Sequence, residues 1–311
     1  MTKTELVIVL PGMANVLGQK INASILPPYL SKIINKARFQ ADSTGLQRLL
    51  LSHFSQMPIT GADLPIVSAL LGQEGILRAD PCYLHPDRDR LLLFADNLDI
   101  SFDEAQGLIA EIQVLLDEWG GELICEQADK WFLRLKSMPD ISFSALPEVS
   151  GKNVQSFLPV GADRQDWIRL WNEIQMKLYD CDINQQRVNN GKLPINSIWF
   201  WGAGEFIAKD KAWASIQGGH PLLEKLAVRA NCSIKNTTDY CTGSLKSGQN
   251  LWLLEDIDTE ADWQQQLQQL DVKIFDPLWQ HCKTNKLSTI RLQIPEYGEY
   301  SITPFDCWKF W

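Results

Sequence analysis

The sequence predicts an α/β protein whose core is a mainly parallel sheet flanked by helices, with an inserted α+β domain. Residues 6–10 read LVIVL, a short continuous apolar run typical of a strand buried on both faces of a parallel sheet. In the last third of the chain, apolar runs at 251–254 and 289–294 alternate with helical patterns, which indicates parallel βαβ units. The pattern changes near Ile76, where short strands and polar turns predict the insertion.

These patterns set the expected domain boundaries. Residues 1–75 and 196–311 are predicted to form the α/β core domain, and residues 76–195 the inserted α+β domain. The apolar run 197–201 (SIWFW) predicts a strand at the point where the chain re-enters the core domain.

Three helices have clear local signals. Residues 46–54 carry leucines and a phenylalanine near helical spacing. Ser101 and Glu104 form a capping-box pattern at the start of a periodic apolar segment, and Gly120 is expected to stop that helix. Apolar residues at helical spacing predict a further helix over about 166–179.

Composition excludes several classes of protein. The 311-residue chain carries a formal charge of −9, which argues against sequence-independent nucleic-acid binding. No apolar run reaches the roughly 20 residues of a membrane helix, and the N-terminal run is too short for a signal peptide. A cytoplasmic protein with neither a nucleic-acid nor a membrane partner is therefore expected. The seven cysteines contain no C-x-x-C pair, which predicts reduced thiols. The twelve tryptophans fit either a core or a ligand platform.

Known nucleotide and nucleophile motifs are incomplete. Gly202 and Gly204 follow a predicted strand, but Ile207 replaces the third glycine of a dinucleotide-binding loop. Residues 243–250 (GSLKSGQN) have the glycine spacing of a phosphate loop without its terminal Lys-Ser/Thr pair. A G-x-S-x-G nucleophile elbow is also lacking from the sequence.

An acidic run follows the predicted strand at 251–254. Within it, Asp256 and Asp258 are weak candidates for a cation site. The alternative is that Asp258 or Thr259 caps the next helix, whose acidic first turn suits the helix dipole. The four histidines are too dispersed in sequence to form a local metal motif.

Polar residues of the insertion form the main candidate ligand site. Guanidinium groups suit phosphate and carboxylate oxygens because they donate hydrogen bonds in parallel pairs. The candidate anion-binding residues are Arg78, Asp80, Arg88, Arg90, Asn184 and Arg187. The alternative is that the arginines pair with neighbouring aspartates on a solvated surface.

These segments carry a family resemblance. Residues 78–81 (RADP), 87–94 (DRDRLLLF), 172–176 (NEIQM) and 193–204 (LPINSIWFWGAG) together resemble the RpfE-type regulatory proteins of bacteria over most of the chain. More distantly, the chain resembles the archaeal-type cofactor-independent phosphoglycerate mutases of the alkaline phosphatase superfamily. That resemblance implies an alkaline-phosphatase-like metal-enzyme core with an inserted domain. It also implies that the four arginines lie where that family binds a phosphorylated acid.

The sequence departs from the mutases at positions that they need for catalysis. The resemblance implies a metal-binding aspartate where Pro11 stands and a nucleophilic serine where Ala62 precedes Asp63. The segment 294–298 replaces the closing metal-binding segment. Proline cannot bind a metal through its side chain, and alanine has no hydroxyl to accept a phosphoryl group. We expect Pro11, Ala62 and Glu296 to surround one altered cleft.

These departures predict a non-catalytic mutase-like protein, without a cofactor, that has a regulatory role or binds a phosphorylated small acid. An alternative is an active mutase or phosphatase that holds a Mn or Zn pair through relocated ligands such as Asp256, Asp258, His220 or His281. A third hypothesis is a protein-interaction module that uses aromatic residues near Trp308 and Trp311 to contact a protein partner.

Overall fold

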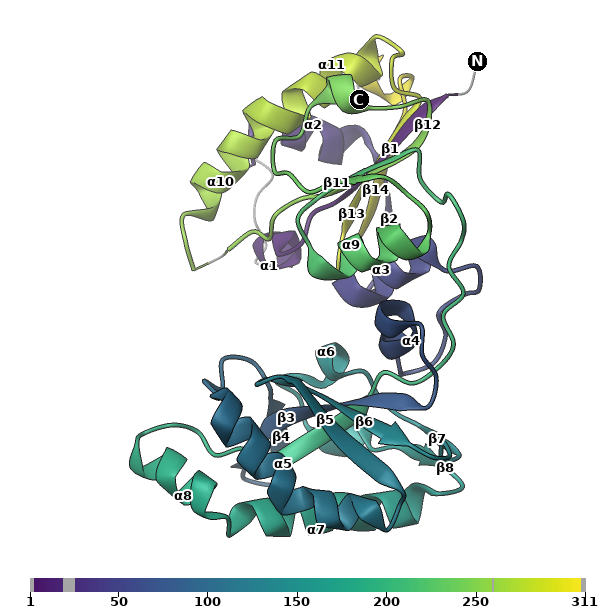
Figure 1. Ribbon diagram of the computed structural model, residues 1–311. Helices are drawn as coiled ribbons and strands as arrows, with labels where there is room; N and C mark the ends of the chain where they lie inside the picture. The colour runs from purple at the N-terminus through teal and green to yellow at the C-terminus, as the bar shows by residue number, and fades with distance from the viewer. Residues whose placement is uncertain (1–2, 19–25, 259, 309–311) are drawn as a thin grey trace. The chain divides into compact units, whose positions relative to one another are not determined.

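The chain folds into two compact units. The computed structural model describes residues 3–18, 26–258 and 260–308 (Figure 1). Unit 1 combines the N-terminal segment Met1–Gln56 with the C-terminal segment Ile207–Trp311, and unit 2 is the continuous segment Met57–Phe206. The chain therefore leaves unit 1 and returns to it once.

Unit 1 contains a seven-stranded mixed sheet with the order β11-β10-β12-β1-β13-β14-β2. Five neighbouring strands, from β11 to β13, run parallel, and β14 and β2 add an antiparallel edge. The strands of unit 1 are β1 (Thr4–Val9), β2 (Arg38–Ala41), β10 (Ser215–Gln217), β11 (Ile234–Lys235), β12 (Gly248–Leu253), β13 (Thr289–Ile294) and β14 (Gly298–Ile302). The prediction of an α/β protein with a mainly parallel sheet is confirmed.

Helices lie on both sides of this sheet (Figure 1). The helical segments of unit 1 are α1 (Met13–Gly18), α2 (Pro28–Lys36), α3 (Leu46–Phe54), α9 (Pro221–Arg229), η3 (Thr242–Ser244), α10 (Trp263–Leu270), η4 (Asp271–Phe275), α11 (Asp276–Lys283) and η5 (Asp306–Trp308). Leu6 and Ile8 pack with α2, α10 and α11 in one buried cluster. Residues 6–10 are all fully buried, as a strand covered on both faces requires.

Unit 2 contains an antiparallel sheet with the order β4-β3-β6-β5, to which β9 pairs through β3. Its strands are β3 (Ile76–Asp87), β4 (Arg90–Phe94), β5 (Gly121–Gln127), β6 (Lys130–Leu135), β7 (Ile141–Ser142), β8 (Val160–Gly161) and β9 (Ser197–Trp201). Its helical segments are α4 (Ile66–Leu71), α5 (Phe102–Asp117), α6 (Leu146–Val149), η2 (Val154–Phe157), α7 (Arg164–Tyr179) and α8 (Asp182–Asn189). It is thus an α+β unit.

The boundaries of the two units differ from the expected ones. Residues 57–75 and 196–206, which we had placed in the core domain, belong to unit 2. The reason is that β9 forms an antiparallel ladder with β3 from Arg78–Trp201 to Cys82–Ser197. An apolar run indicates a buried strand but does not indicate which strand it will pair with.

The N-terminal cap was predicted correctly for one helix and incorrectly for another. Ser101 and Glu104 form both hydrogen bonds of the capping box at the start of α5, as predicted. The cap of α10 is Asp262, whose side chain accepts a hydrogen bond from Gln265 N at 3.1 Å. The prediction that Asp258 caps this helix is wrong, because the cap lies four residues later, at Asp262; Thr259 lies outside the described residues. None of the helices in the described ranges is long and apolar enough to cross a membrane.

Candidate functional site

The candidate site of unit 1 lies at the carboxyl edge of its parallel sheet, where α/β proteins commonly bind ligands. Pro11 follows β1, Asp256 follows β12, and Glu296 follows β13, and all three line one pocket with Asp258. A neighbouring pocket shares Pro11 and Asp256 and adds His220, which follows β10. The segments that follow four parallel strands therefore line these two adjoining pockets, which together form one cleft.

Backbone hydrogen bonds fix the loops of this cleft. Pro11 O accepts a hydrogen bond from Ile257 N at 3.1 Å, so the loops after β1 and β12 are joined directly. Glu296 N donates to Thr44 O at 2.8 Å, which anchors the β13–β14 turn. Glu296 has a φ of +65°, a left-handed conformation that is uncommon for residues other than glycine. Backbone hydrogen bonds between neighbouring loops thus hold the walls of the cleft in place.

Gly12 allows the loops after β1 and β12 to approach this closely. Its φ is +72°, and a Cβ atom at this position would lie 2.2 Å from Asp256 Oδ1 and 2.3 Å from Ile257 O. Real side chains do not make such contacts, and one of the two atoms belongs to the backbone. Only glycine fits here without moving the Asp256–Ile257 segment.

We predict that Gly12→Ala lowers the free energy of unfolding by about 2 kcal/mol, through the left-handed conformation and the overlap together. Gly191→Ala is the matched control, because Gly191 has a similar φ of +74° with open space around it. The control should lose only about 1 kcal/mol. Urea unfolding curves measure both, and equal losses would show that the close approach at Gly12 has no energetic weight.

The cleft is rich in negative charge. Burial raises the pKa of Asp256, and the neighbouring charge of Asp258 raises it further. Asp258 itself accepts a hydrogen bond from Glu260 N at 2.9 Å. Burial lowers the pKa of His220, whose Nδ1 accepts from Leu222 N, so this ring favours the neutral form. An anion without a bound cation would meet repulsion here.

The residues of this edge do not fit the two-metal centre that the mutase resemblance implies. Pro11 offers no side-chain ligand, and its carbonyl already accepts from Ile257 N. Within residues 3–18, 26–258 and 260–308, His, Cys, Asp and Glu side chains form no group of three or more that could hold a metal ion. Asp256 and Asp258 lie in one pocket but lack a third such ligand within these ranges.

Ala62 and Asp63 lie in unit 2, just before α4. Asp63 Oδ1 accepts from Gly202 N at 2.8 Å, and its Oδ2 accepts from Ala203 N at 2.9 Å. The carboxylate therefore holds the turn that follows β9. Gly202 is required there for close packing, since a Cβ atom would lie 2.9 Å from Ile66 Cγ2. This explains the glycine motif without a dinucleotide.

Arg78 and Asp80 form an ion pair within the sheet of unit 2. Arg78 Nε lies 3.0 Å from Asp80 Oδ1, and Trp201 Nε1 donates to Asp80 Oδ2 at 2.6 Å. The guanidinium also lies over the Phe132 ring, with Cζ 5.0 Å from its centroid. Burial raises the pKa of Asp80, while the charge of Arg78 opposes this shift. Both predicted ligand residues are thus engaged inside the protein.

Arg88 and Arg90 lie at the β3–β4 turn, and both are exposed. Arg90 Nη2 pairs with Asp87 Oδ2 at 2.5 Å. Arg88 sits in the turn with a φ of +56°. Arg78 lies near the start of β3, ten residues before Arg88, and ten residues of extended chain span roughly 30 Å. The structure therefore does not bring Arg78 together with the two arginines of the turn.

Asn184 and Arg187 are buried on α8 and bind the backbone. Asn184 Nδ2 donates to Leu178 O at 2.7 Å and to Ile195 O at 2.9 Å. Arg187 Nε donates to Leu193 O at 2.9 Å, and Nη1 lies 3.0 Å from Glu104 Oε2. These contacts tie α8 to the start of α5 and to the segment before β9. We had assigned both side chains to ligand binding, and sequence gave no signal of these backbone partners.

The C-terminal aromatic residues are only partly described. Trp308 is 57% exposed, and Lys283 Nζ lies 4.7 Å from the centroid of its ring. Phe305 is also exposed. Trp311 lies outside the described residues.

The chain is distantly similar to cofactor-independent phosphoglycerate mutases. A segment of 58 residues is 36% identical to a probable 2,3-bisphosphoglycerate-independent phosphoglycerate mutase of Geobacter sulfurreducens, and covers 19% of this chain and 14% of that protein. A segment of 71 residues is 32% identical to a 2,3-bisphosphoglycerate-independent phosphoglycerate mutase of Methanosarcina mazei, and covers 23% and 18% of the two chains. The matches thus span less than a fifth of these relatives. No family model matches the chain.

Two solved structures align with nearly the whole chain. A cofactor-independent phosphoglycerate mutase from Thermoplasma acidophilum aligns with a TM-score of 0.43 and 14% identity, over 97% of this chain and 90% of that one. A protein from Pyrococcus horikoshii aligns with a TM-score of 0.46 and 11% identity, over 97% and 87%. Neither of these structures, nor the two sequence relatives above, is an RpfE-type protein by name.

Proposed function

We propose that this chain is a non-catalytic protein of the phosphoglycerate-mutase type, with an alkaline-phosphatase-like core and a regulatory, ligand-binding role. Pro11 carries the proposal. It stands at the carboxyl end of β1, where the resemblance implies the first metal-binding aspartate, and Pro11 O is joined to Ile257 N. Pro11 therefore joins two loops of the cleft through its backbone carbonyl, and its side chain provides no metal ligand.

The second support comes from the expected nucleophile segment. Ala62 has no hydroxyl, and the adjacent Asp63 carboxylate accepts hydrogen bonds from Gly202 N and Ala203 N. A carboxylate held by two backbone amides is a structural clamp, and binding a metal through it would compete with both bonds. The same residue that the resemblance places next to catalysis thus stabilises unit 2.

For an anionic ligand, the β3–β4 turn is the better location. The carboxyl edge of unit 1 carries Asp256 and Asp258, which repel an anion. Arg78 and Arg187 already have acidic or carbonyl partners. At the turn, Asp87 is paired with Arg90, and Arg88 is exposed; Arg88 is the side chain that we assign to a phosphorylated small acid.

We predict no mutase turnover with added Mn²⁺ or Zn²⁺, and millimolar binding of 3-phosphoglycerate that Arg88→Asn weakens at least about threefold, as one exposed charge contact allows. Asparagine suits the left-handed backbone at this position. Arg134→Gln is the matched control, because Arg134 is exposed and paired with Glu122 in the same unit. A coupled mutase assay measures turnover, and isothermal titration calorimetry measures binding to the unaltered protein and to the two variants.

The alternative function is an active metal-dependent mutase or phosphatase with relocated ligands. It is favoured by one observation, namely that Asp256 and His220 line the same pocket. Mn²⁺-dependent turnover that Asp256→Asn abolishes would establish this alternative and exclude the non-catalytic proposal. Absent turnover together with binding unchanged by Arg88→Asn would remove the anion site while leaving the lack of catalysis in place.

A further inference from the structure

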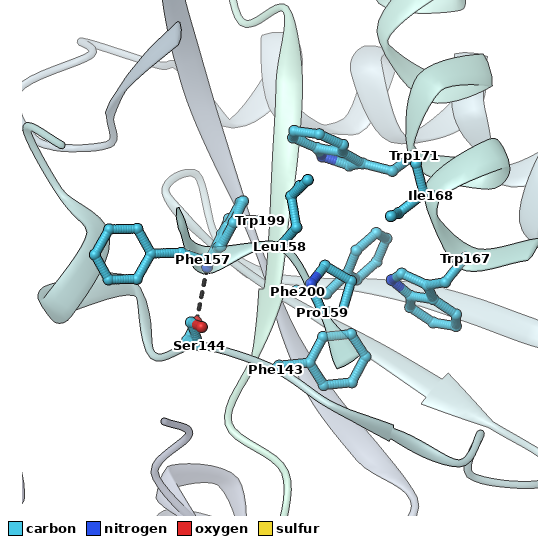
Figure 2. Close-up of a pocket in the computed structure, with 10 residues that line it drawn as sticks. All are labelled: Phe143, Ser144, Phe157, Leu158, Pro159, Trp167, Ile168, Trp171, Trp199 and Phe200. Atoms are coloured by element: carbon cyan, nitrogen blue, oxygen red, sulfur yellow. Dashed lines mark hydrogen bonds between the residues drawn. The ribbon is translucent and has the colours of Figure 1, made fainter. Parts of the chain in front are cut away.

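Unit 2 contains a small aromatic cavity that the proposed function does not use. It has a volume of about 20 Å³ and is lined by the rings of Phe143, Phe157, Trp167, Trp171, Trp199 and Phe200 (Figure 2). The rings come from α7, β9 and the segments around η2 and β7. The residues that line it carry no charged side chain. Its environment therefore differs from that of the acidic cleft in unit 1.

The three indole groups around the cavity differ in their hydrogen bonding. Trp171 Nε1 donates to Ile198 O at 2.8 Å, and Trp199 Nε1 donates to Ser144 O at 2.8 Å. Trp167 Nε1 is buried and has no hydrogen-bond partner in the described part of the chain, although the residue is only 1% exposed. Figure 2 shows the Trp167 nitrogen on the side of its ring that faces Pro159 and Phe200.

An unpaired buried N–H group carries a free-energy cost, because it has lost its bonds to water. Three aromatic rings lie around Trp167: the ring centroids of Phe200, Trp119 and Phe143 lie at 4.9, 5.3 and 5.4 Å. Aromatic faces accept hydrogen bonds only weakly. An oxygen placed in the cavity would therefore gain a full hydrogen bond without displacing an existing one.

Size and charge restrict the ligand. A cavity of about 20 Å³ holds roughly one water molecule, so a larger ligand must displace part of the wall. Phe157 is the last residue of η2 and Leu158 follows it, and both are half-buried, so displacing this part of the wall costs less buried contact than displacing the fully buried rings. A charged ligand is excluded, because no lining side chain would compensate its loss of solvation.

We propose that this cavity binds a small, neutral, mainly apolar molecule that accepts one hydrogen bond from Trp167 Nε1 through a carbonyl oxygen. The aromatic rings supply the apolar contact, and the indole N–H orients the carbonyl. The proposal is independent of the anion site and of catalysis, so it stands or fails separately from the proposed function.

Acetophenone and ethylbenzene are matched probes, since they differ chiefly in the carbonyl oxygen. The full-length protein is expected to bind acetophenone about 5- to 30-fold more tightly than ethylbenzene, the ratio that one buried hydrogen bond gives. Trp167→Phe should remove this preference while leaving ethylbenzene binding nearly unchanged. In ¹H–¹⁵N spectra, the indole N–H resonance of Trp167 should move downfield with acetophenone only.

The control is Trp252→Phe, which removes an indole that is equally buried and, among the described residues, also lacks a hydrogen-bond partner, but that belongs to unit 1 and does not line the cavity. It should leave the acetophenone preference intact. Ile168→Phe adds bulk at a half-buried wall position and should block both probes without removing the Trp167 N–H. Equal affinity for the two probes, an unmoved Trp167 resonance, or a cavity that exchanges only water would overturn the proposal.

Discussion

Replacing Arg187 with methionine is expected to lower the free energy of unfolding by about 3–5 kcal/mol. The guanidinium is buried, and it donates three hydrogen bonds to backbone carbonyls: Nη2 to Leu98 O, Nη1 to Asp99 O and Nε to Leu193 O. Methionine fills much of the space but donates no hydrogen bond. Three carbonyl oxygens and the Glu104 carboxylate would lose a partner, and the loss at the buried carbonyl of Leu98 is the most costly.

The contribution of Arg187 to stability depends on pH, because Arg187 is paired with the Glu104 carboxylate. Burial acts to raise the pKa of Glu104, but the hydrogen bond from Ser101 N and the charge of Arg187 lower it overall. Because the folded-state pKa is depressed, this stabilisation is present above the unfolded-state pKa and is lost as the pH falls through the folded-state value. The Arg187→Met penalty should therefore shrink at acidic pH.

Arg90→Met is the control for Arg187→Met. Both arginines were predicted as anion ligands, but Arg90 is 54% exposed and is paired with Asp87 at the surface. Its replacement should change the stability by no more than about 0.5 kcal/mol. Urea unfolding at pH 7, followed by tryptophan fluorescence, measures both. A loss below about 1 kcal/mol for Arg187→Met would contradict the structural role and return Arg187 to the list of free ligand residues.

Signals confined to a few residues of the sequence predicted their structures correctly. The capping box at Ser101 and Glu104 depends only on the geometry of one helix turn, and it forms as expected. The run 6–10 is apolar throughout because both faces of β1 are covered. The mutase resemblance implied that Pro11, Ala62 and Glu296 surround one cleft; Pro11 and Glu296 line the same pocket of unit 1, whereas Ala62 belongs to unit 2.

Contacts between residues that are far apart in the sequence could not be predicted from such local signals. Nothing near Arg187 indicates that its guanidinium will bind carbonyls 88 and 89 residues earlier. The run 197–201 has the pattern of any buried strand, so its pairing with β3 was not predictable. The sequence also could not show that the Trp167 N–H lacks a partner. Helical spacing predicts that a tryptophan is buried, but it does not predict whether its N–H will donate a hydrogen bond.

The second large prediction concerns Arg78, whose replacement by methionine should destabilise the protein by about 3–5 kcal/mol. Asp80 is 2% exposed, and its carboxylate depends on Arg78 and on the Trp201 N–H. Burial already raises the pKa of Asp80 with the arginine present. Without it, the folded protein must either hold an unpaired buried charge or take up a proton.

A double-mutant cycle separates this electrostatic cost from lost packing. Asp80→Asn is close in shape and keeps an oxygen for the Trp201 N–H, so the double variant Arg78→Met/Asp80→Asn has no unpaired charge left in the sheet. We expect it to be more stable than Arg78→Met alone by about 1–3 kcal/mol, a coupling typical of contacting residues. If the two single losses simply add, Arg78 acts through its contacts with Phe132 and Trp201 instead. In that case Asp80 would not need a cation, and a bound acid could compete for the Arg78 guanidinium at little cost to the fold.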